Sequence, residues 1–93
     1  MMTLEHIRIA FAAEEGALRR VLGLIEARGF IIRSMQMVGD DAHVVLTLAI
    51  TPRDGSRRVA ILLRQIERLH SVGGAHALSN APPVVEVRHA AVA

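Results

Sequence analysis

Two different periodicities of apolar residues shape the first third of the chain. Between residues 4 and 11 apolar and other side chains alternate, so that Ile7, Ile9 and Phe11 share one face. This alternation predicts a β-strand with one buried face. From residue 14 to residue 28 the apolar positions recur every three or four residues, which is typical of an amphipathic helix. The residues of this stripe are Leu18, Val21, Leu22 and Ile25.

Residues at both ends of this first helix support its placement. Glu14 and Glu15 lie where a carboxylate favours the partial positive charge of a helix N-terminus. Gly29 follows the helical segment and suits a left-handed C-terminal stop. We therefore expect a helix over residues 14–28.

Two further strands are predicted at residues 30–38 and 43–51. The intervening sequence, Gly-Asp-Asp-Ala at residues 39–42, has the composition of a hairpin turn. The second of these strands is apolar on both faces, as expected for an interior strand.

A second helix and a final strand complete the pattern. Asp54 or Ser56 could cap the helix, which is expected to extend to about His70. Its apolar stripe consists of Val59, Leu62, Leu63 and Ile66. Gly73 and Gly74 are expected to break the chain. Residues 74–79 and 84–88 are both candidates for the last strand; we favour the first, with residues 81–93 as a tail or extra edge strand.

The order of elements predicts an α+β, ferredoxin-like βαββαβ domain over residues 4–80. Right-handed crossovers would place both helices on one face of a four-stranded antiparallel sheet with strand order 2-3-1-4. The second strand then lies at an edge, which favours pairing with another copy of the chain. The residues at this predicted dimer edge are Ile31, Arg33, Met35 and Met37.

Composition narrows the classes of function. Apolar residues make up 52% of the chain, which suggests that another subunit covers part of the surface. The sequence pI is about 11.0, but the net charge is only +2 and every basic residue is arginine, so strong attraction to phosphate does not follow. Without cysteine there is no disulfide or thiolate chemistry. With no signal-peptide pattern and no membrane-length apolar run, we expect a cytoplasmic protein.

No pattern in the sequence predicts catalysis, a metal or a cofactor. The histidines are scattered, the serines lack a nucleophile-elbow context, and the adjacent carboxylates of Asp40 and Asp41 diverge in a turn. Ferredoxin-like domains that bind RNA stack bases on aromatic side chains, and this chain has two phenylalanines, one of them in the core pattern. We expect neither an enzyme nor a nucleic-acid partner.

Two features are candidates for binding. An arginine row, assigned to one face of the second helix, could dock an acidic protein surface or simply be solvated; it consists of Arg53, Arg57, Arg64 and Arg68. The junction around Gly16, between the first strand and the first helix, could hold a carboxylate on free backbone N–H groups. It could equally be a tight turn and nothing more.

The residues from this junction onward resemble a known family. Gly16-Ala17-Leu18-Arg19-Arg20-Val21, followed by Arg28-Gly29-Phe30 and a strand with Ser34-Met35, is similar to the ACT domain of acetohydroxyacid synthase (acetolactate synthase) small subunits. The resemblance covers roughly residues 7–78. It is greatest to the short, valine-insensitive isozyme type.

The resemblance implies a non-catalytic regulatory subunit in branched-chain amino acid biosynthesis. Its partners would be a thiamine-diphosphate-dependent catalytic subunit and a second copy, paired through the second strand and first helix. An amino-acid effector would lie at the dimer interface. The residues aligned with that effector site are Ala13, Glu15, Gly16, Ala17, Leu18, Ile31 and Ile32.

Two departures from the family pattern argue against valine as the effector. Valine-sensitive members carry asparagine at the positions of Ala13 and Ile31, and neither alanine nor isoleucine can replace the amide hydrogen bonds. Leaving ligand charges without partners costs several kcal/mol. The alternative function is a stand-alone ACT dimer that senses another small metabolite.

Overall fold

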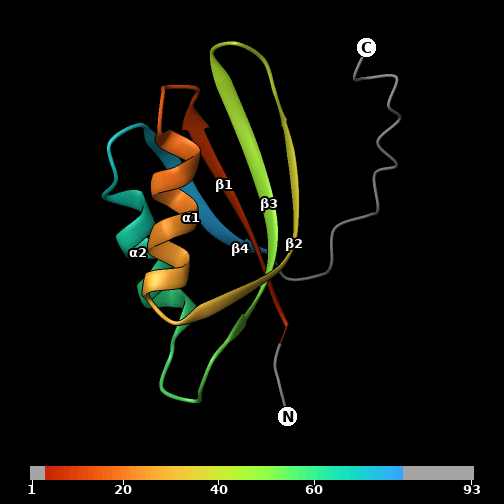
Figure 1. Cartoon of the computed structure of the whole chain (residues 1–93), viewed down its shortest axis with the longest axis vertical. Coiled ribbons are helices and arrows are strands. Elements are labelled where there is room, and N and C mark those ends of the chain that lie inside the picture. Colours follow the sequence, from red (N-terminus) through yellow and green to blue (C-terminus); the bar gives the residue numbers. More distant parts are fainter. Residues whose placement is uncertain (1–3, 79–93) are drawn as a thin grey trace.

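The computed structural model describes residues 4–78 of the chain, and its elements follow the predicted βαββαβ order (Figure 1). Each predicted strand and helix is present, with shifted ends. The elements are β1 (Glu5–Ala12), α1 (Ala17–Ala27), β2 (Phe30–Gly39), β3 (His43–Pro52), α2 (Val59–Glu67) and β4 (Val72–Leu78).

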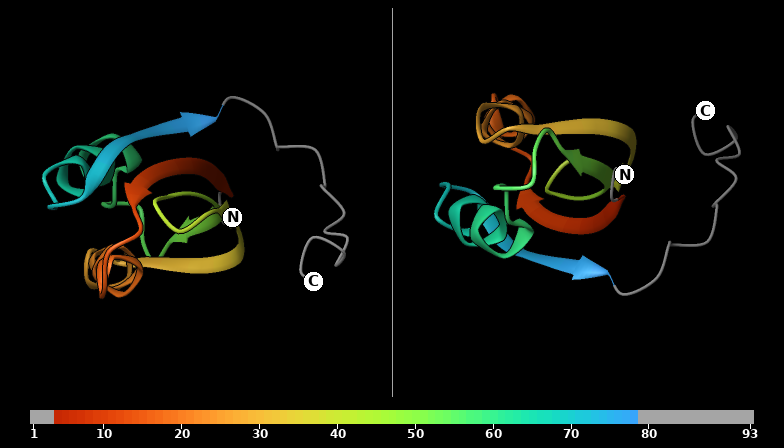
Figure 2. Two further views of the ribbon diagram at one scale, coloured as in Figure 1. Left: turned by 90° about the horizontal axis from the view of Figure 1, so that it is seen from above. Right: turned by 90° about the horizontal axis from the view of Figure 1, so that it is seen from below.

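The four strands form one antiparallel sheet in the order β2-β3-β1-β4, which confirms the predicted order. β1 and β3 lie in the middle and pair along their whole lengths, from Glu5 opposite Ile50 to Ala12 opposite His43. Figure 2, which views the molecule end-on, shows both helices on the same side of a curled sheet. β2 is therefore an edge strand.

The core lies between this sheet and the two helices. Ile7 and Ile9 of β1 are fully buried, as the alternation predicted. Fully burying one aliphatic side chain stabilises the fold by about 1.5–3 kcal/mol, so this single layer of contacts carries most of the stability. The other large buried residues are Phe11, Val21, Ile25, Phe30, Leu46, Leu48, Ile50, Leu62 and Ile66.

The last strand is the earlier of the two predicted candidates. β4 begins at Val72, so Gly73 and Gly74 lie inside a strand and the predicted chain break there is wrong. Gly74 pairs with Ala10, and the register between β1 and β4 shifts just beyond that pair. Glycines are tolerated beside such an irregularity. The alternative strand at 84–88 and the tail at 81–93 lie outside the described residues.

Gly29 ends α1 in the predicted left-handed conformation, with φ of 91°. Its N–H donates to the Glu26 carbonyl (3.1 Å), and its own carbonyl accepts from the Arg53 N–H (2.8 Å). The guanidinium of Arg57 lies where a side chain at residue 29 would start, since an added Cβ would be 2.5 Å from Arg57 Nε. The turn between α1 and β2 is thereby fixed to the segment that follows β3.

Asp40 organises the turn between β2 and β3. Its carboxylate oxygen Oδ1 accepts hydrogen bonds from the backbone N–H groups of Ala42 (2.8 Å) and His43 (2.9 Å). These donors, with His43 the stronger, hold the pKa of the Asp40 carboxyl below its ordinary value of 3.8. The hairpin predicted at residues 39–42 is confirmed.

The two glycines of the first helical region should respond oppositely to alanine. Gly29→Ala should destabilise the protein by about 1–2 kcal/mol, because a Cβ is strained in the left-handed region. Gly23→Ala, the matched control inside α1, should stabilise by roughly 1 kcal/mol, since nothing lies within 4 Å of the new methyl group. Urea unfolding measures both. A Gly29→Ala variant as stable as wild type would contradict the role of the left-handed stop.

Asp40→Asn should show how much the negative charge of the Asp40 carboxylate stabilises the turn between β2 and β3. The pKa of Asp40 is lower in the folded state than in the unfolded state. The ionised carboxylate therefore stabilises the protein at any pH above the unfolded-state pKa, and this stabilisation is lost as the pH falls through the folded-state pKa. The variant should be less stable than wild type at pH 7, and the difference should shrink below about pH 4. Urea midpoints across this range measure it. Asp41→Asn, which removes a neighbouring charge without these hydrogen bonds, is the control; an equal response would refute the assignment.

Candidate functional site

The loop between β1 and α1 contains the predicted effector residues, and its geometry differs from the sequence-based expectation. α1 begins at Ala17, with Gly16 as the N-cap residue at φ of 81°. Glu14 and Glu15 therefore precede the helix, and the prediction that they lie in its first turn is wrong. The cause is local: the Ala17 N–H donates to the Glu14 carbonyl (3.0 Å), so residues 14–17 form a turn.

Two other turns hold this loop in place. The Ala13 N–H donates to the carbonyl of Ala42 in the β2–β3 hairpin (2.9 Å). The Ala12 N–H donates to the carbonyl of Ser71 in the turn before β4 (2.8 Å). Ser71 itself has a φ of 84°, which is uncommon for a residue with a side chain. The loop is therefore fixed by backbone hydrogen bonds to segments far away in the sequence.

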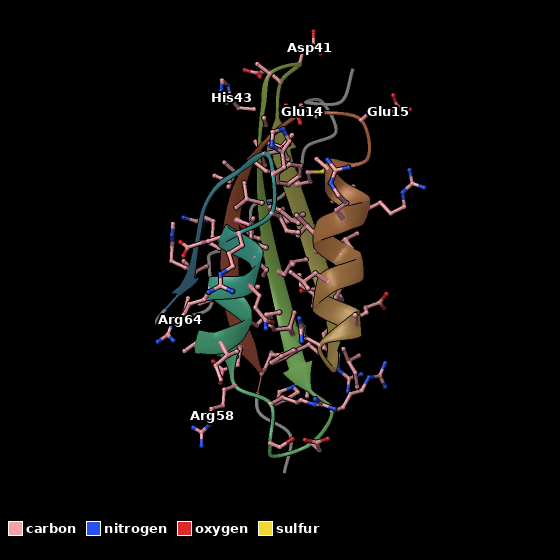
Figure 3. The ribbon with its side chains drawn as sticks, turned by 90° about the vertical axis from the view of Figure 1, so that its left-hand side faces the viewer. Glu14, Glu15, Asp41, His43, Arg58 and Arg64 are labelled. Atoms are coloured by element: carbon pink, nitrogen blue, oxygen red, sulfur yellow. The ribbon has the colours of Figure 1, made fainter. Side chains whose placement is uncertain are left out.

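A small polar cluster lies beside the loop. The Ser71 hydroxyl donates to Glu14 Oε1, and His70 Nε2 lies 3.6 Å from the same oxygen. Figure 3 shows Glu14 at the same end of the molecule as Asp41 and His43. The cluster ties two turns together, and sequence reasoning missed it.

A hollow of ≈ 280 Å³ opens next to this cluster. Ser71 and His43 are its polar side chains, and the rest of its lining is mainly small or apolar, including Ala12 and Val45. Such a hollow suits a small apolar group. It is formed by β1, β3 and the start of β4.

The predicted effector residues form two groups that one chain does not bring together. Ala13, Glu15, Gly16, Ala17 and Leu18 lie at the start of α1. Ile31 and Ile32 follow its far end, because β2 begins three residues after α1 (Figure 1). An 11-residue helix is roughly 16 Å long. A single ligand of amino-acid size cannot contact both groups of one chain.

The edge strand β2 exposes apolar side chains, as predicted. Met35 is 49% exposed, Met37 51% and Val38 61%. Met35 and Met37 pair with Leu48 and Leu46, so they point to the helix side of the sheet but lie beyond its buried part. The register shifts between Ile32 and Ser34, which places a bulge at Arg33. Ile31 and Ile32 are only partly buried.

The predicted arginine row does not share one face of α2. The helix begins at Val59, so Arg53 and Arg57 precede it; Arg64 lies within it and Arg68 is its C-cap. Figure 3 shows Arg58 and Arg64 projecting outward from the α2 region. The periodicity that grouped these residues assumed a longer helix. Their role in docking stays a prediction.

The start of α2 also differs from the prediction. The N-cap is Arg58, and neither Asp54 nor Ser56 caps the helix. Asp54 instead accepts hydrogen bonds from the hydroxyl (2.5 Å) and N–H (2.9 Å) of Ser56 and lies 3.6 Å from Arg57 Nε. The Ser56 hydroxyl, helped by its N–H and by Arg57, lowers the pKa of the Asp54 carboxyl. Asp54 therefore shapes the loop and positions Arg57.

Two searches of residues 4–78 bear on other classes of site. No three His, Asp or Glu side chains in this range are grouped so as to hold a metal ion. Neither α1 nor α2 combines the length and apolar character that a helix needs to cross a membrane.

Comparisons with known proteins agree on the fold. The ACT domain of a GTP pyrophosphokinase from Chlorobium tepidum is similar over 84% of this chain and 100% of its own length, with 19% identity and a TM-score of 0.72. The C-terminal domain of MgtC from Mycobacterium tuberculosis is 16% identical, with coverage of 87% and 93% and a TM-score of 0.62. A homoserine dehydrogenase from Thiobacillus denitrificans is 20% identical over 84% of this chain but 17% of its own, with a TM-score of 0.60.

These identities establish similarity of fold alone, and no curated protein sequence gives a significant match. The sequence profile of the ACT domain matches residues 13–75, from the loop before α1 into β4. This match spans more than half of the chain and includes both segments that carry the resemblance found in the sequence. The chain belongs to the ACT domain family of regulatory modules.

Proposed function

We propose that this ACT domain is the non-catalytic small subunit of an acetohydroxyacid synthase. It would raise the activity of a catalytic subunit in branched-chain amino acid biosynthesis, and that subunit would supply the thiamine diphosphate. Support comes from the Gly16–Val21 and Arg28–Phe30 segments, which resemble those of such small subunits and lie at the two ends of α1.

The observation that carries the proposal is the exposed apolar surface of the edge strand β2. Met35, Met37 and Val38 are half exposed on a strand that has a single neighbouring strand, β3, among residues 4–78, and such an edge is stabilised by pairing with another strand. A second copy of the chain provides an identical edge. We therefore propose a homodimer formed through β2 and α1.

A twofold-symmetric dimer would also complete the effector site. In such a dimer the two copies of α1 run in opposite directions, so the start of one lies near the end of the other. Ile31 of one chain could then lie beside Gly16 of its partner. The two groups that one chain keeps roughly 16 Å apart would form one site between two chains.

The side chains at this shared site do not suit valine. Ala13 is exposed and Ile31 partly buried, and neither carries a polar side-chain atom for the ammonium or carboxylate of an amino acid. We propose that the subunit activates its partner without feedback inhibition by valine.

A second candidate function is a stand-alone ACT dimer that senses another small metabolite. The observation that favours it is the hollow beside Ser71, whose hydroxyl is bonded to Glu14. Together they offer polar groups next to an apolar surface, close to the loop that the family resemblance assigns to effector binding.

Addition of the full chain to the purified catalytic subunit from the same organism should raise acetolactate formation severalfold. Valine at millimolar concentration should leave that activity unchanged. A colorimetric assay of acetolactate measures both. A catalytic subunit that neither binds the chain nor responds to it would contradict the proposal.

Thermal unfolding against the twenty amino acids separates the two candidates. A ligand at 100 times its Kd stabilises the fold by about 2.7 kcal/mol, which corresponds to a rise in Tm of roughly 10 °C or more for a domain of this size. The subunit proposal expects no such shift with valine. A large shift with one other amino acid, without activation of the synthase, would favour the sensor.

Glutamate at both Met35 and Met37 should convert the dimer to a monomer. These side chains are half exposed in the single chain, so the change should leave the fold intact while placing charges in the interface. Sedimentation velocity measures the oligomeric state. Leu4→Glu, at a residue that is 53% exposed outside β2, is the control and should remain dimeric. A double variant that still dimerises would refute the proposed edge.

A further inference from the structure

A second hollow, of ≈ 150 Å³, opens between the start of β2 and α2. It brings together side chains from the end of α1, the start of β2, the loop after β3 and α2. The residues that form it include Arg28, Phe30, Arg57, Arg58, Ile61 and Gln65.

The floor of this hollow is apolar and its rim is basic. Phe30 and the neighbouring Leu62 are each 1% exposed, whereas Ile61 on the rim is 49% exposed. Arg28, Arg57 and Arg58 supply three guanidinium groups. An exposed isoleucine among cationic side chains favours a partner that offers both an apolar group and a negative charge.

Most of this positive charge has no carboxylate partner among residues 4–78. Arg57 has one carboxylate partner, Asp54, at 3.6 Å. Neither Arg28 nor Arg58 forms an ion pair with any of residues 4–78. A rim with more guanidinium than carboxylate attracts an acidic surface and rejects a basic one.

Arg57 is held in position before any partner arrives. Its guanidinium occupies the space left free by Gly29 and is paired with Asp54. A side chain that is already ordered loses less conformational entropy on binding. Arg28 and Arg58 are exposed and able to adjust to a partner.

We propose that this hollow docks an acidic segment of the catalytic subunit in which an apolar side chain lies next to one or more carboxylates. The apolar side chain contacts Ile61 and the floor, and the carboxylates bind the guanidinium groups. This inference rests on the proposed subunit function and moves the docking surface from the helical arginine row to the start of α2. A nucleic acid is disfavoured because Phe30 and Phe11 are buried and offer no stacking surface.

The hollow and the dimer edge can be occupied together. The hollow takes one residue, Phe30, from the start of β2, and the rest of its lining comes from Arg28, the loop after β3 and α2. The half-exposed edge residues Met35, Met37 and Val38 lie in the second half of β2. A second copy paired along β2 leaves α2 accessible. Each protomer of a dimer can therefore hold one catalytic subunit.

Calorimetric titration of the full-length chain into the purified catalytic subunit tests the site. Arg58→Glu and Ile61→Asp should each raise the Kd at least about tenfold, as expected for residues at the centre of an interface. Arg64→Glu and Arg68→Glu make the same charge change outside the hollow and should alter the Kd by less than about threefold. Circular dichroism and sedimentation should show that all four variants remain folded and dimeric.

The outcomes separate this site from the function on which it rests. Binding of Arg58→Glu and Ile61→Asp with the wild-type Kd would overturn the docking site and leave the subunit function intact. Weakening by Arg64→Glu or Arg68→Glu instead would return docking to the helix surface and also overturn it. If the wild-type chain itself shows no binding, the subunit function fails and the docking site fails with it. Loss of dimerisation in Arg58→Glu would assign the hollow to the second copy and refute the proposal.

Discussion

The architecture depends on one constraint: within residues 4–78 both helices cover the same face of the sheet, and the strand order leaves β2 at an edge. The face beneath the helices consists of Ile7 and Ile9 of β1 and alternate residues of β3, and these side chains are buried. At the β2 edge, residues 4–78 provide no further strand, and Met35 and Met37 remain half exposed. Pairing with a strand of a second chain would cover this edge.

The length of α1 links pairing at this edge to the proposed effector site. The helix separates the Gly16 turn from the start of β2, so the residues that the family resemblance groups around an effector lie at opposite ends of one chain. Two chains that pair through β2 and α1 would reunite them. Ligand binding and association would then be linked, since a ligand held by both chains stabilises the dimer.

The loop before α1 is anchored by backbone hydrogen bonds to two turns that are distant in the sequence. Backbone bonds from Ala12 and Ala13 reach the turn before β4 and the hairpin turn shaped by Asp40. A ligand that moved this loop would have to break these hydrogen bonds or move the two turns together with the loop. The loop is therefore better suited to a preformed site than to a large rearrangement.

The type and order of the elements could be predicted from the sequence, because the alternation around Ile7 and Ile9 and the helical stripes are local patterns. Gly29 at the end of α1 and the Asp40 turn followed from residue chemistry in the same way. Handedness rules then sufficed for the strand order. These features depend on neighbours a few residues apart.

Contacts between residues that are distant in the sequence could not be predicted in this way. The contact of Glu14 with Ser71 spans 57 residues and joins the loop before α1 to the turn before β4. Asp54 likewise binds its own loop instead of capping α2. Arg28 and Arg58 line the same hollow although β2 and β3 separate them in the sequence. Such contacts depend on how the packed elements place their ends, which no local periodicity encodes.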